Sequence, residues 1–201
     1  MSMEHDPQGL GLEHGDHVCG FYYSPEERDA MLLPYLREGL QRGDKCVAVV
    51  DSTRPEELML RIEGAAEAAE SGQLEVFDSD ETYLQTGTFD PDLTIDFWEV
   101  RAKQLVDEGE FDFIRLTGEL SWLDRSDTPR ESIVRYESWA DQFVLRYPMT
   151  ILCLYDLRRM GSSVMMDLLR THPKLLLGGL LLENPHHISS DDFSAACSYT
   201  P

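Results

Sequence analysis

The chain has 201 residues, of which 42% are hydrophobic and 27% are charged, a composition typical of one globular domain. Its 38 acidic side chains outnumber the 17 Lys and Arg side chains, which leaves a formal net charge of −21. Such a field repels nucleic-acid phosphates and anionic membrane surfaces, so we expect neither direct nucleic-acid binding nor membrane binding by this chain.

The cysteine pattern and the chain ends predict the compartment. The four cysteines are widely spaced, and three of them lie in apolar runs, which is typical of buried free thiols in a reducing environment. The first residues form no basic region followed by an apolar run, and the longest apolar stretch, 175–182, is too short to cross a bilayer. We therefore expect a cytoplasmic protein without a signal peptide.

Strand-like apolar runs alternate with helical patterns along the chain. Helices are expected to begin after Ser24, Asp51, Asp90 and Thr128, where capping residues precede apolar positions at helical spacing, and a shorter helix is expected at about 162–171. The segment 78–89 reads as a polar loop. Strands are predicted at 17–23, 45–50, 74–77, in the first half of 111–122, at 149–155, and as a sixth strand or small hairpin at 175–182.

This alternation predicts an α/β fold with right-handed crossovers between parallel strands. We expect a doubly wound, mostly parallel sheet of about six strands with helices on both faces, in three layers. Residues 16–185 are predicted to form a single domain, with flexible tails at 1–15 and 186–201.

The stretch 111–122 combines a dense apolar run with unusual polar groups. Arg115 interrupts the predicted buried strand, and a buried guanidinium requires a partner because an uncompensated charge is costly there. Glu119 is the nearest candidate in sequence, and Trp122 is placed to form a wall of the same region. Two interpretations stay open: a structural ion pair, and a polar anchor for a ligand.

Ligands of doubly wound sheets bind beyond the carboxyl ends of the strands. In this chain that rim is predicted to gather an acidic and aromatic set, with one arginine: Tyr22, Tyr23, Asp51, Asp78, Glu119, Trp122, Tyr155, Asp156 and Arg158. No glycine-rich phosphate-binding motif follows any strand, which removes the usual signature of nucleotide binding. No second catalytic group stands at a characteristic sequence spacing from Glu119, so we predict no catalytic residue and a non-enzymatic protein.

His17 and Cys19 are two residues apart on a predicted strand and therefore face the same side. Imidazole and thiolate are zinc ligands, but two ligands do not make a site. His172 and His14 add to them only if the fold brings them close. A packed strand histidine and cysteine is the default interpretation, so no metal or other cofactor is predicted.

Short motifs in a fixed order give the chain a resemblance to a known family, the methanogen/methylotroph DcmR-type sensory domain, MEDS. The resemblance covers about residues 14–185. The motifs that carry it are His17-Val18-Cys19-Gly20-Phe21-Tyr22, Ser24-Pro25-Glu26-Glu27, Arg37-Glu38-Gly39-Leu40, Gly43-Asp44-Lys45-Cys46, Arg115-Leu116-Thr117-Gly118-Glu119 with Trp122, Cys153-Leu154-Tyr155-Asp156, His172-Pro173 and Asn184-Pro185.

The resemblance implies a sensory domain of bacterial and archaeal signalling that responds to small organic molecules, including hydrocarbon derivatives. It also implies that the domain is attached to, or acts together with, a DNA-binding, histidine-kinase or anti-sigma module. The family is distantly related to the RecA/KaiC-like ATPase fold. One departure matters: the loop after the first strand, 23–27, contains no phosphate-binding lysine. We therefore do not extend ATP hydrolysis to this chain.

The leading hypothesis is a non-enzymatic sensory or regulatory domain. It binds a small, largely apolar organic ligand near Arg115, Glu119 and Trp122 and signals to a regulatory protein partner in transcriptional or two-component regulation. One alternative is a degenerate RecA-like nucleotide-binding protein or ATPase. The other is an acidic protein-interaction module without a ligand. Homo-oligomerisation is compatible with each of the three.

Overall fold

A seven-stranded sheet forms the middle layer of the computed structural model, which describes residues 10–125 and 127–188. The strand order is β3-β2-β4-β5-β1-β6-β7, and every neighbouring pair is parallel except the antiparallel pair β6 and β7. The strands are β1 (His17–Tyr22), β2 (Lys45–Val50), β3 (Leu74–Asp78), β4 (Ile114–Glu119), β5 (Met149–Asp156), β6 (Lys174–Leu177) and β7 (Leu180–Glu183).

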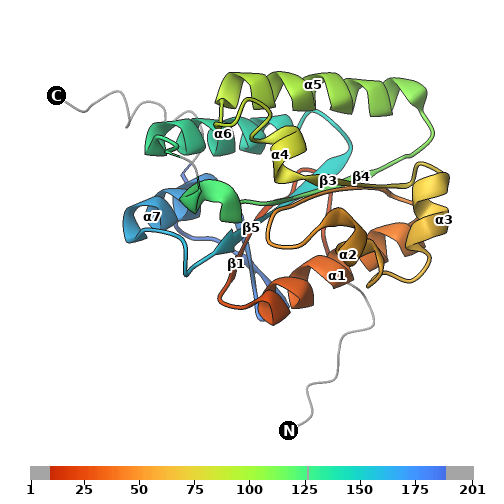
Figure 1. Ribbon diagram of the computed structural model, residues 1–201, viewed down its shortest axis with the longest axis horizontal. Coiled ribbons are helices and arrows are strands. Elements are labelled where there is room, and N and C mark those ends of the chain that lie inside the picture. Colours follow the sequence, from red (N-terminus) through yellow and green to blue (C-terminus); the bar gives the residue numbers. More distant parts are fainter. Residues whose placement is uncertain (1–9, 126, 189–201) are drawn as a thin grey trace, which may run out of the picture.

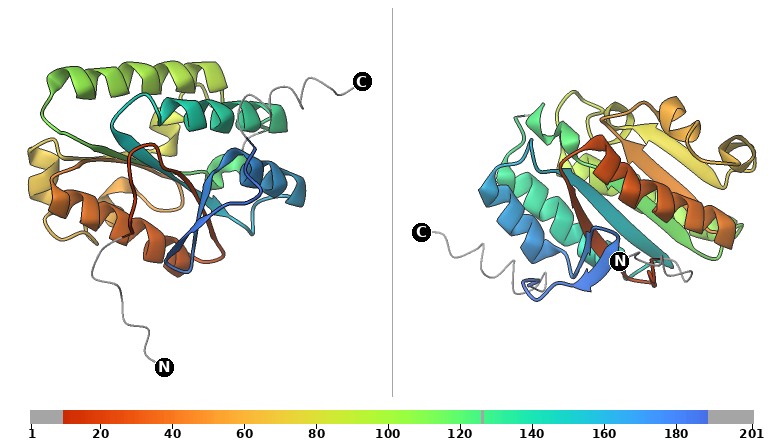
Figure 2. Two further views of the ribbon diagram at one scale, coloured as in Figure 1. Left: turned by 180° about the vertical axis from the view of Figure 1, so that it is seen from behind. Right: turned by 90° about the horizontal axis from the view of Figure 1, so that it is seen from below.

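Helices cover both faces of the sheet, as the doubly wound prediction requires. Figure 1 shows α5 and α6 on one side of the strands and α1 on the other, and the rear view in Figure 2 shows the same layers. The helices are α1 (Pro25–Arg42), α2 (Pro55–Met59), α3 (Ala65–Glu70), α4 (Ser79–Thr82), α5 (Pro91–Glu108), α6 (Arg130–Phe143) and α7 (Ser162–Thr171), with a 3-10 turn η1 (Ser121–Asp124).

The central strands are buried along their whole length, which explains their continuous apolar sequences. Every residue of β2, β4 and β5 is buried, as expected for parallel strands covered on both faces. Two apolar cores result. One lies between the sheet and α5, α6 and α7, and the other lies between the sheet and α1, α2 and α3.

The predicted helix starts at Ser24 and Asp90 are confirmed. Ser24 Oγ accepts a hydrogen bond from the Glu27 N–H, and Pro25 occupies the first turn of α1. The Asp90 carboxylate accepts from the first N–H groups of α5. By contrast, the N-cap of α6 is Pro129, one residue later than the Thr128 expected from the sequence, and Pro129 provides no side-chain cap.

Two other local expectations are corrected, and one open alternative is decided. The helix expected after Asp51 is two short helices, α2 and α3, separated by a turn that ends at Gly64, whose φ of 75° breaks the helical path. The segment 78–89, predicted as a polar loop, contains α4 and buries Tyr83 and Phe89. The last apolar run adopts the hairpin alternative, β6 and β7, at the edge of the sheet.

The predicted tails fall mostly beyond the described part of the chain. Residues 1–9 and 189–201 lie outside the described residues, while 10–15 and 186–188 lie inside them. Among the described helices, none is long and apolar enough to cross a membrane. The three described cysteines are free and buried, as expected from their apolar surroundings.

Candidate functional site

Glu119, the last residue of β4, is the centre of a buried polar group at the carboxyl ends of the strands. Its Oε1 accepts a hydrogen bond from the Tyr22 hydroxyl at 2.7 Å, and its Oε2 accepts from the backbone N–H groups of Asp51 and Ser52 at 3.0 and 3.2 Å. Arg28 Nη1 lies 3.4 Å from Oε2. One carboxylate therefore connects β4 to β1, to α1 and to the segment after β2.

The Asp51 carboxylate extends this polar group toward η1 and α4. Ser79 Oγ donates to Asp51 Oδ1 and Ser121 Oγ donates to Asp51 Oδ2, both at 2.6 Å. Arg125 also donates to Asp51. Burial and the neighbouring Glu119 carboxylate raise the pKa of the Tyr22 phenol, so Tyr22 remains a hydrogen-bond donor.

Trp122 lies in an aromatic cluster directly after this polar group. Its indole is fully buried, stacks on Tyr83 with ring centroids 5.2 Å apart, and lies 4.9 Å from the Phe89 ring. The Tyr136 ring meets the Tyr83 ring edge-on. The aromatic cluster therefore joins η1, α4 and α6 beside the carboxyl end of β4.

A shallow hollow opens next to the aromatic cluster. About 150 Å³ of empty space, part of it open to solvent, lies over Tyr83 and the start of α5. The hollow is smaller than the 300 to 1,000 Å³ that is roughly usual for pockets of drug-sized ligands. Its lining residues are Thr82, Tyr83, Gln85, Thr86, Thr88, Asp90, Leu93 and Thr94.

The other predicted rim residues do not all converge on Glu119. Asp156 lies opposite Tyr22 in the register of β5 and β1, and its carboxylate binds the Arg158 guanidinium at 2.6 Å. Tyr155 is buried on the other face of the sheet from Tyr22, in the core under α6. Tyr23 is 60% exposed. The structure thus brings Tyr22, Glu119 and Asp156 to one end of the sheet and separates Tyr155 from them.

Arg115 is buried as expected, but its pairing with Glu119 is wrong. Its Nε donates to Asp44 at 2.7 Å and its Nη2 donates to Glu38 at 3.0 Å, both near the amino end of β4. Four residues of strand separate two Cα atoms by roughly 13 Å, too far for these side chains to meet. Arg115 is therefore part of a structural ion pair at the opposite end of the strand from the ligand rim.

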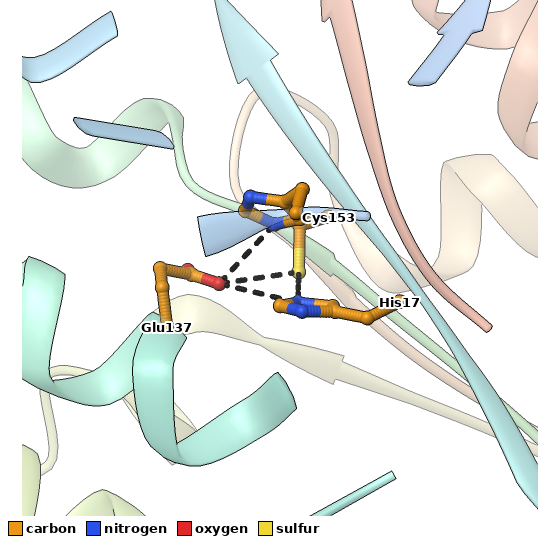
Figure 3. A group of neighbouring side chains, drawn as sticks. His17, Glu137 and Cys153 are labelled. Atoms are coloured by element: carbon orange, nitrogen blue, oxygen red, sulfur yellow. Dashed lines mark hydrogen bonds and ion pairs between the residues drawn. The ribbon is translucent and has the colours of Figure 1, made fainter. Parts of the chain in front are cut away.

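A second polar group lies inside the core between the sheet and helices α6 and α7. It consists of His17, Glu137, Cys153 and His172, all buried, with one ligand-type atom from each within 4.8 Å of the others. Figure 3 shows His17, Glu137 and Cys153 pointing toward one another from β1, α6 and β5. Imidazole, carboxylate and thiolate groups are the usual protein ligands of zinc.

The protonation of this group follows from its neighbours. His172 Nδ1 lies 2.7 Å from the Leu168 carbonyl oxygen, which only accepts, so the ring proton is on Nδ1. Glu137 is fully buried between the two rings, with its Oε2 3.4 Å from His17 Nε2 and 3.3 Å from His172 Nε2.

The sequence identified part of this group. His17 and His172 belong to the group, whereas Cys19 and His14 do not. The cysteine of the group is Cys153, the register partner of Cys19 on β5. Glu137 and Cys153 were missed as candidates. Glu137 carried a readable signal, because it follows Ile133 by four residues on the buried side of α6, where a charged residue is unusual.

Comparison with solved structures defines the fold class first. The flagellar accessory protein FlaH from Methanocaldococcus jannaschii matches with a TM-score of 0.57 and 14% identity over 85% of this chain and 76% of that chain. The KaiC-like protein PH0186 from Pyrococcus horikoshii OT3 matches with a TM-score of 0.55 and 13% identity over 81% and 71% of the two chains. The domain therefore has a RecA/KaiC-like α/β fold, as predicted.

The family follows from the sequence. The model of the MEDS family, the methanogen/methylotroph DcmR sensory domain, matches residues 16–173, and the chain belongs to this family. The transcriptional repressor DcmR of Methylorubrum extorquens is 28% identical over 171 residues. This match covers 82% of the chain but spans only 60% of the relative's length. Family and relative together support a sensory or regulatory role.

Proposed function

We propose that this chain is a non-enzymatic sensory domain that binds a small, largely apolar organic molecule beside Trp122 and passes the event to a regulatory protein partner. The observation that carries the proposal is a hydrogen-bonded connection at the carboxyl end of β4: Ser121, next to Trp122 of the aromatic cluster, donates to Asp51, and the Asp51 N–H donates to Glu119. Membership of the MEDS family supports the sensory role.

The size of the hollow limits the ligand. Its floor includes Tyr83, whose ring stacks on Trp122, so a rotation of this one side chain would join the hollow to the aromatic cluster. The enclosed space of the hollow is only about 10 Å³, roughly enough for one water molecule, and most of its lining side chains are polar. The ligand therefore binds only if Tyr83 rotates and opens space beside Trp122, which limits the proposed ligand class to small alcohols, ketones, haloalkanes and similar hydrocarbon derivatives.

The polar group around Glu119 supplies a route from ligand to partner. Trp122 follows Ser121, whose hydroxyl binds Asp51, and the backbone of Asp51 in turn binds Glu119. A ligand that displaces Trp122 would strain these bonds and shift α1 through Arg28. Such a shift is possible only if the ligand binds one arrangement more tightly than the other.

The partner is proposed to be a protein, such as a histidine kinase, an anti-sigma factor or a DNA-binding regulator. The net charge of −21 disfavours direct contact of this chain with DNA and favours a basic protein surface. The 40% of the related repressor outside the match leaves room for such an output module in that protein, since the match spans 60% of its length.

A reporter variant tests the ligand. In Trp98→Phe with Trp139→Phe, Trp122 is the sole tryptophan, and chloroform, butanone and butanol are titrated while its fluorescence is followed. We expect a saturable change for at least one probe, together with a rise in melting temperature. Absence of both responses for every probe would refute ligand binding at this rim.

A pair of surface variants locates the ligand. Leu93 lines the hollow and is 50% exposed, whereas Leu60 is 87% exposed and does not line it. Leu93→Arg places a charge over the hollow and should weaken probe binding about tenfold, the equivalent of 1.4 kcal/mol. Leu60→Arg is the matched control and should bind normally. Equal affinity in both variants would place the ligand elsewhere.

A further inference from the structure

Four of the six ligand-atom distances within the buried group of His17, Glu137, Cys153 and His172 are close to those of a coordination site, and all six are within 4.8 Å. Glu137 Oε2 lies 3.4 Å from His17 Nε2 and 3.3 Å from His172 Nε2. Cys153 Sγ lies 3.5 Å from His17 Nε2 and 3.7 Å from Glu137 Oε2. Ligand atoms around a tetrahedral zinc ion, with bonds of roughly 2.0 to 2.3 Å, are roughly 3.3 to 3.6 Å apart. The four measured distances agree better with these separations than with the lengths of N–H···O hydrogen bonds, which are roughly 2.7 to 3.2 Å.

His172 adds a second, independent observation. With its proton on Nδ1, facing the Leu168 carbonyl, its Nε2 presents a lone pair to the Glu137 carboxylate. This Nε2 is buried and has no hydrogen-bond partner. Two electron-rich atoms that face each other inside a core repel, unless a cation lies between them.

The outer nitrogen of the His172 ring is held in the way that metal-binding histidines usually are. His172 Nδ1 faces a backbone carbonyl at 2.7 Å, which fixes the tautomer that leaves its Nε2 free for a metal. His17 Nδ1 lies 3.7 Å from the Asp141 carboxylate, which is longer than a hydrogen bond. Both Nε2 atoms point toward Glu137 and Cys153.

We propose that His17, Glu137, Cys153 and His172 together bind one zinc-type divalent ion. Two imidazoles, a thiolate and a carboxylate suit zinc, and the two negative ligands balance its charge inside the core. On binding, the S–H bond of Cys153 breaks, its proton is released to solvent, and the sulfur electron pair forms the bond to the metal. Because four protein ligands fill a tetrahedral site, the ion has a structural role that ties β1, β5, α6 and the residue after α7 together (Figure 3).

This site is separate from the proposed ligand rim. It contains neither Glu119 nor Trp122, and its members come from the core under α6 and α7. Loss of metal binding would leave the sensory proposal standing, and failure to find an organic ligand would leave the metal proposal standing.

Cobalt substitution tests the site directly on the full chain. The protein is purified without chelator and its metal content is measured, then it is unfolded in chelator, refolded metal-free and titrated with Co²⁺. We expect one equivalent of Co²⁺ to produce a thiolate-to-cobalt charge-transfer band and the intense visible bands of tetrahedral coordination. A metal-free purified protein whose Co²⁺ titration gives neither band would overturn the proposal.

Two cysteine variants identify the sulfur ligand. Cys19 and Cys153 are register partners on β1 and β5, and both are buried in the same core. Cys153→Ser should abolish the charge-transfer band and weaken Co²⁺ binding by more than the roughly 10- to 100-fold cost of losing an outer-shell partner. Cys19→Ser should retain the band.

The reverse result, a band lost in Cys19→Ser and kept in Cys153→Ser, would refute this ligand set. If Cys153→Ser does not fold, alkylation of the wild-type protein decides instead. Unfolding in denaturant without chelator should then leave Cys153 protected from alkylation for longer in the Zn²⁺-loaded than in the metal-free protein. Equal alkylation rates would count against the proposal.

Discussion

Strand β4 carries two buried charges of opposite sign, and each is neutralised by a different set of neighbours. Arg115 contacts Asp44 and Glu38 at the amino end, whereas Glu119 contacts Arg28 and several N–H and O–H donors at the carboxyl end. A buried charge without a partner costs several kcal/mol. Each of these two residues therefore fixes the position of the segments that contact it.

Replacement of Arg115 by alanine is expected to destabilise the fold strongly. The guanidinium is 1% exposed, and its loss leaves Asp44 and Glu38 without their main cation. We expect the free energy of unfolding to fall by about 3 kcal/mol, the usual cost of breaking a buried ion pair. Urea denaturation followed by circular dichroism measures it.

Arg42→Ala is the matched control for Arg115→Ala. Arg42 approaches the same two carboxylates at 3.8 and 3.9 Å, but its side chain is 62% exposed. We expect a change within about 0.5 kcal/mol for this surface arginine. Equal losses in the two variants would show that burial does not distinguish these arginines.

Glu119→Gln tests the polar group at the ligand rim. An amide keeps the size of the side chain, and its oxygen can still accept from the N–H groups of Asp51 and Ser52, but its NH₂ group then replaces the oxygen that accepts from the Tyr22 hydroxyl, and the charge facing Arg28 is lost. The lost acceptor and the unpaired buried guanidinium should lower the free energy of unfolding by about 2 kcal/mol. The exposed Glu56→Gln, in neighbouring α2, should cost little in the same urea experiment. A neutral Glu119→Gln would mean that these bonds do not stabilise the fold.

The sequence located the unusual residues better than their partners. An arginine in an apolar run can be recognised from the sequence alone, and Arg115 is indeed buried. Its partners, Asp44 and Glu38, are more than seventy residues away in the chain, with separations of 71 and 77. No periodicity encodes such a contact, because it depends on β2 pairing with β4 and on how α1 crosses them.

At the scale of elements, strong local signals were sufficient to predict where helices begin, whereas weak signals did not predict where helices break. The capped starts of α1 and α5 were predicted from Ser24-Pro25 and Asp90-Pro91, since a cap satisfies free N–H groups wherever the helix lies. The break between α2 and α3 was not predicted, because the apolar spacing continues through Gly64. Tertiary packing of Tyr83 and Phe89, similarly, has no signal in a segment of polar residues.

The edge strand β3 depends on an ion pair that should respond to acid. Glu75 on β3 binds Lys45 of β2 and Arg101 of α5. Burial raises the pKa of Glu75, but these two cations outweigh it and lower the pKa below its ordinary value. Stability from this group is therefore present above the unfolded pKa of about 4.3 and is lost as pH falls through the lower folded pKa.

Glu75→Gln should therefore lose stability at pH 7, and this loss should shrink as the pH falls below the unfolded pKa and wild-type Glu75 takes up a proton. The free energies of unfolding of both proteins are compared by urea denaturation across this range. Glu67→Gln, at an exposed position of α3, controls for the loss of one negative charge. A difference between wild type and Glu75→Gln that stays constant with pH would contradict the ion-pair account.

At the scale of the whole molecule, the sheet separates two sites with different chemistry. The carboxyl ends of the strands carry the Glu119 group and the aromatic cluster, while the core under α6 and α7 encloses the His17, Glu137, Cys153 and His172 group. The fold class was predictable because alternating strands and helices permit few topologies. The enclosed group was not, because its members meet only when β1, β5, α6 and the residue after α7 pack together.

The shared RecA/KaiC-like fold makes ATP the most informative ligand to exclude. In the loop after β1, Glu27 accepts from the Tyr23 N–H and Ser24 accepts from the Glu27 N–H, so side chains of the chain itself occupy groups that would face a phosphate. The loop also has no lysine. We expect no shift in melting temperature with ATP and Mg²⁺, whereas a ligand at 100 times its dissociation constant would stabilise by about 2.7 kcal/mol. Mg²⁺ alone is the control, and a saturable shift that requires ATP would restore the nucleotide-binding alternative.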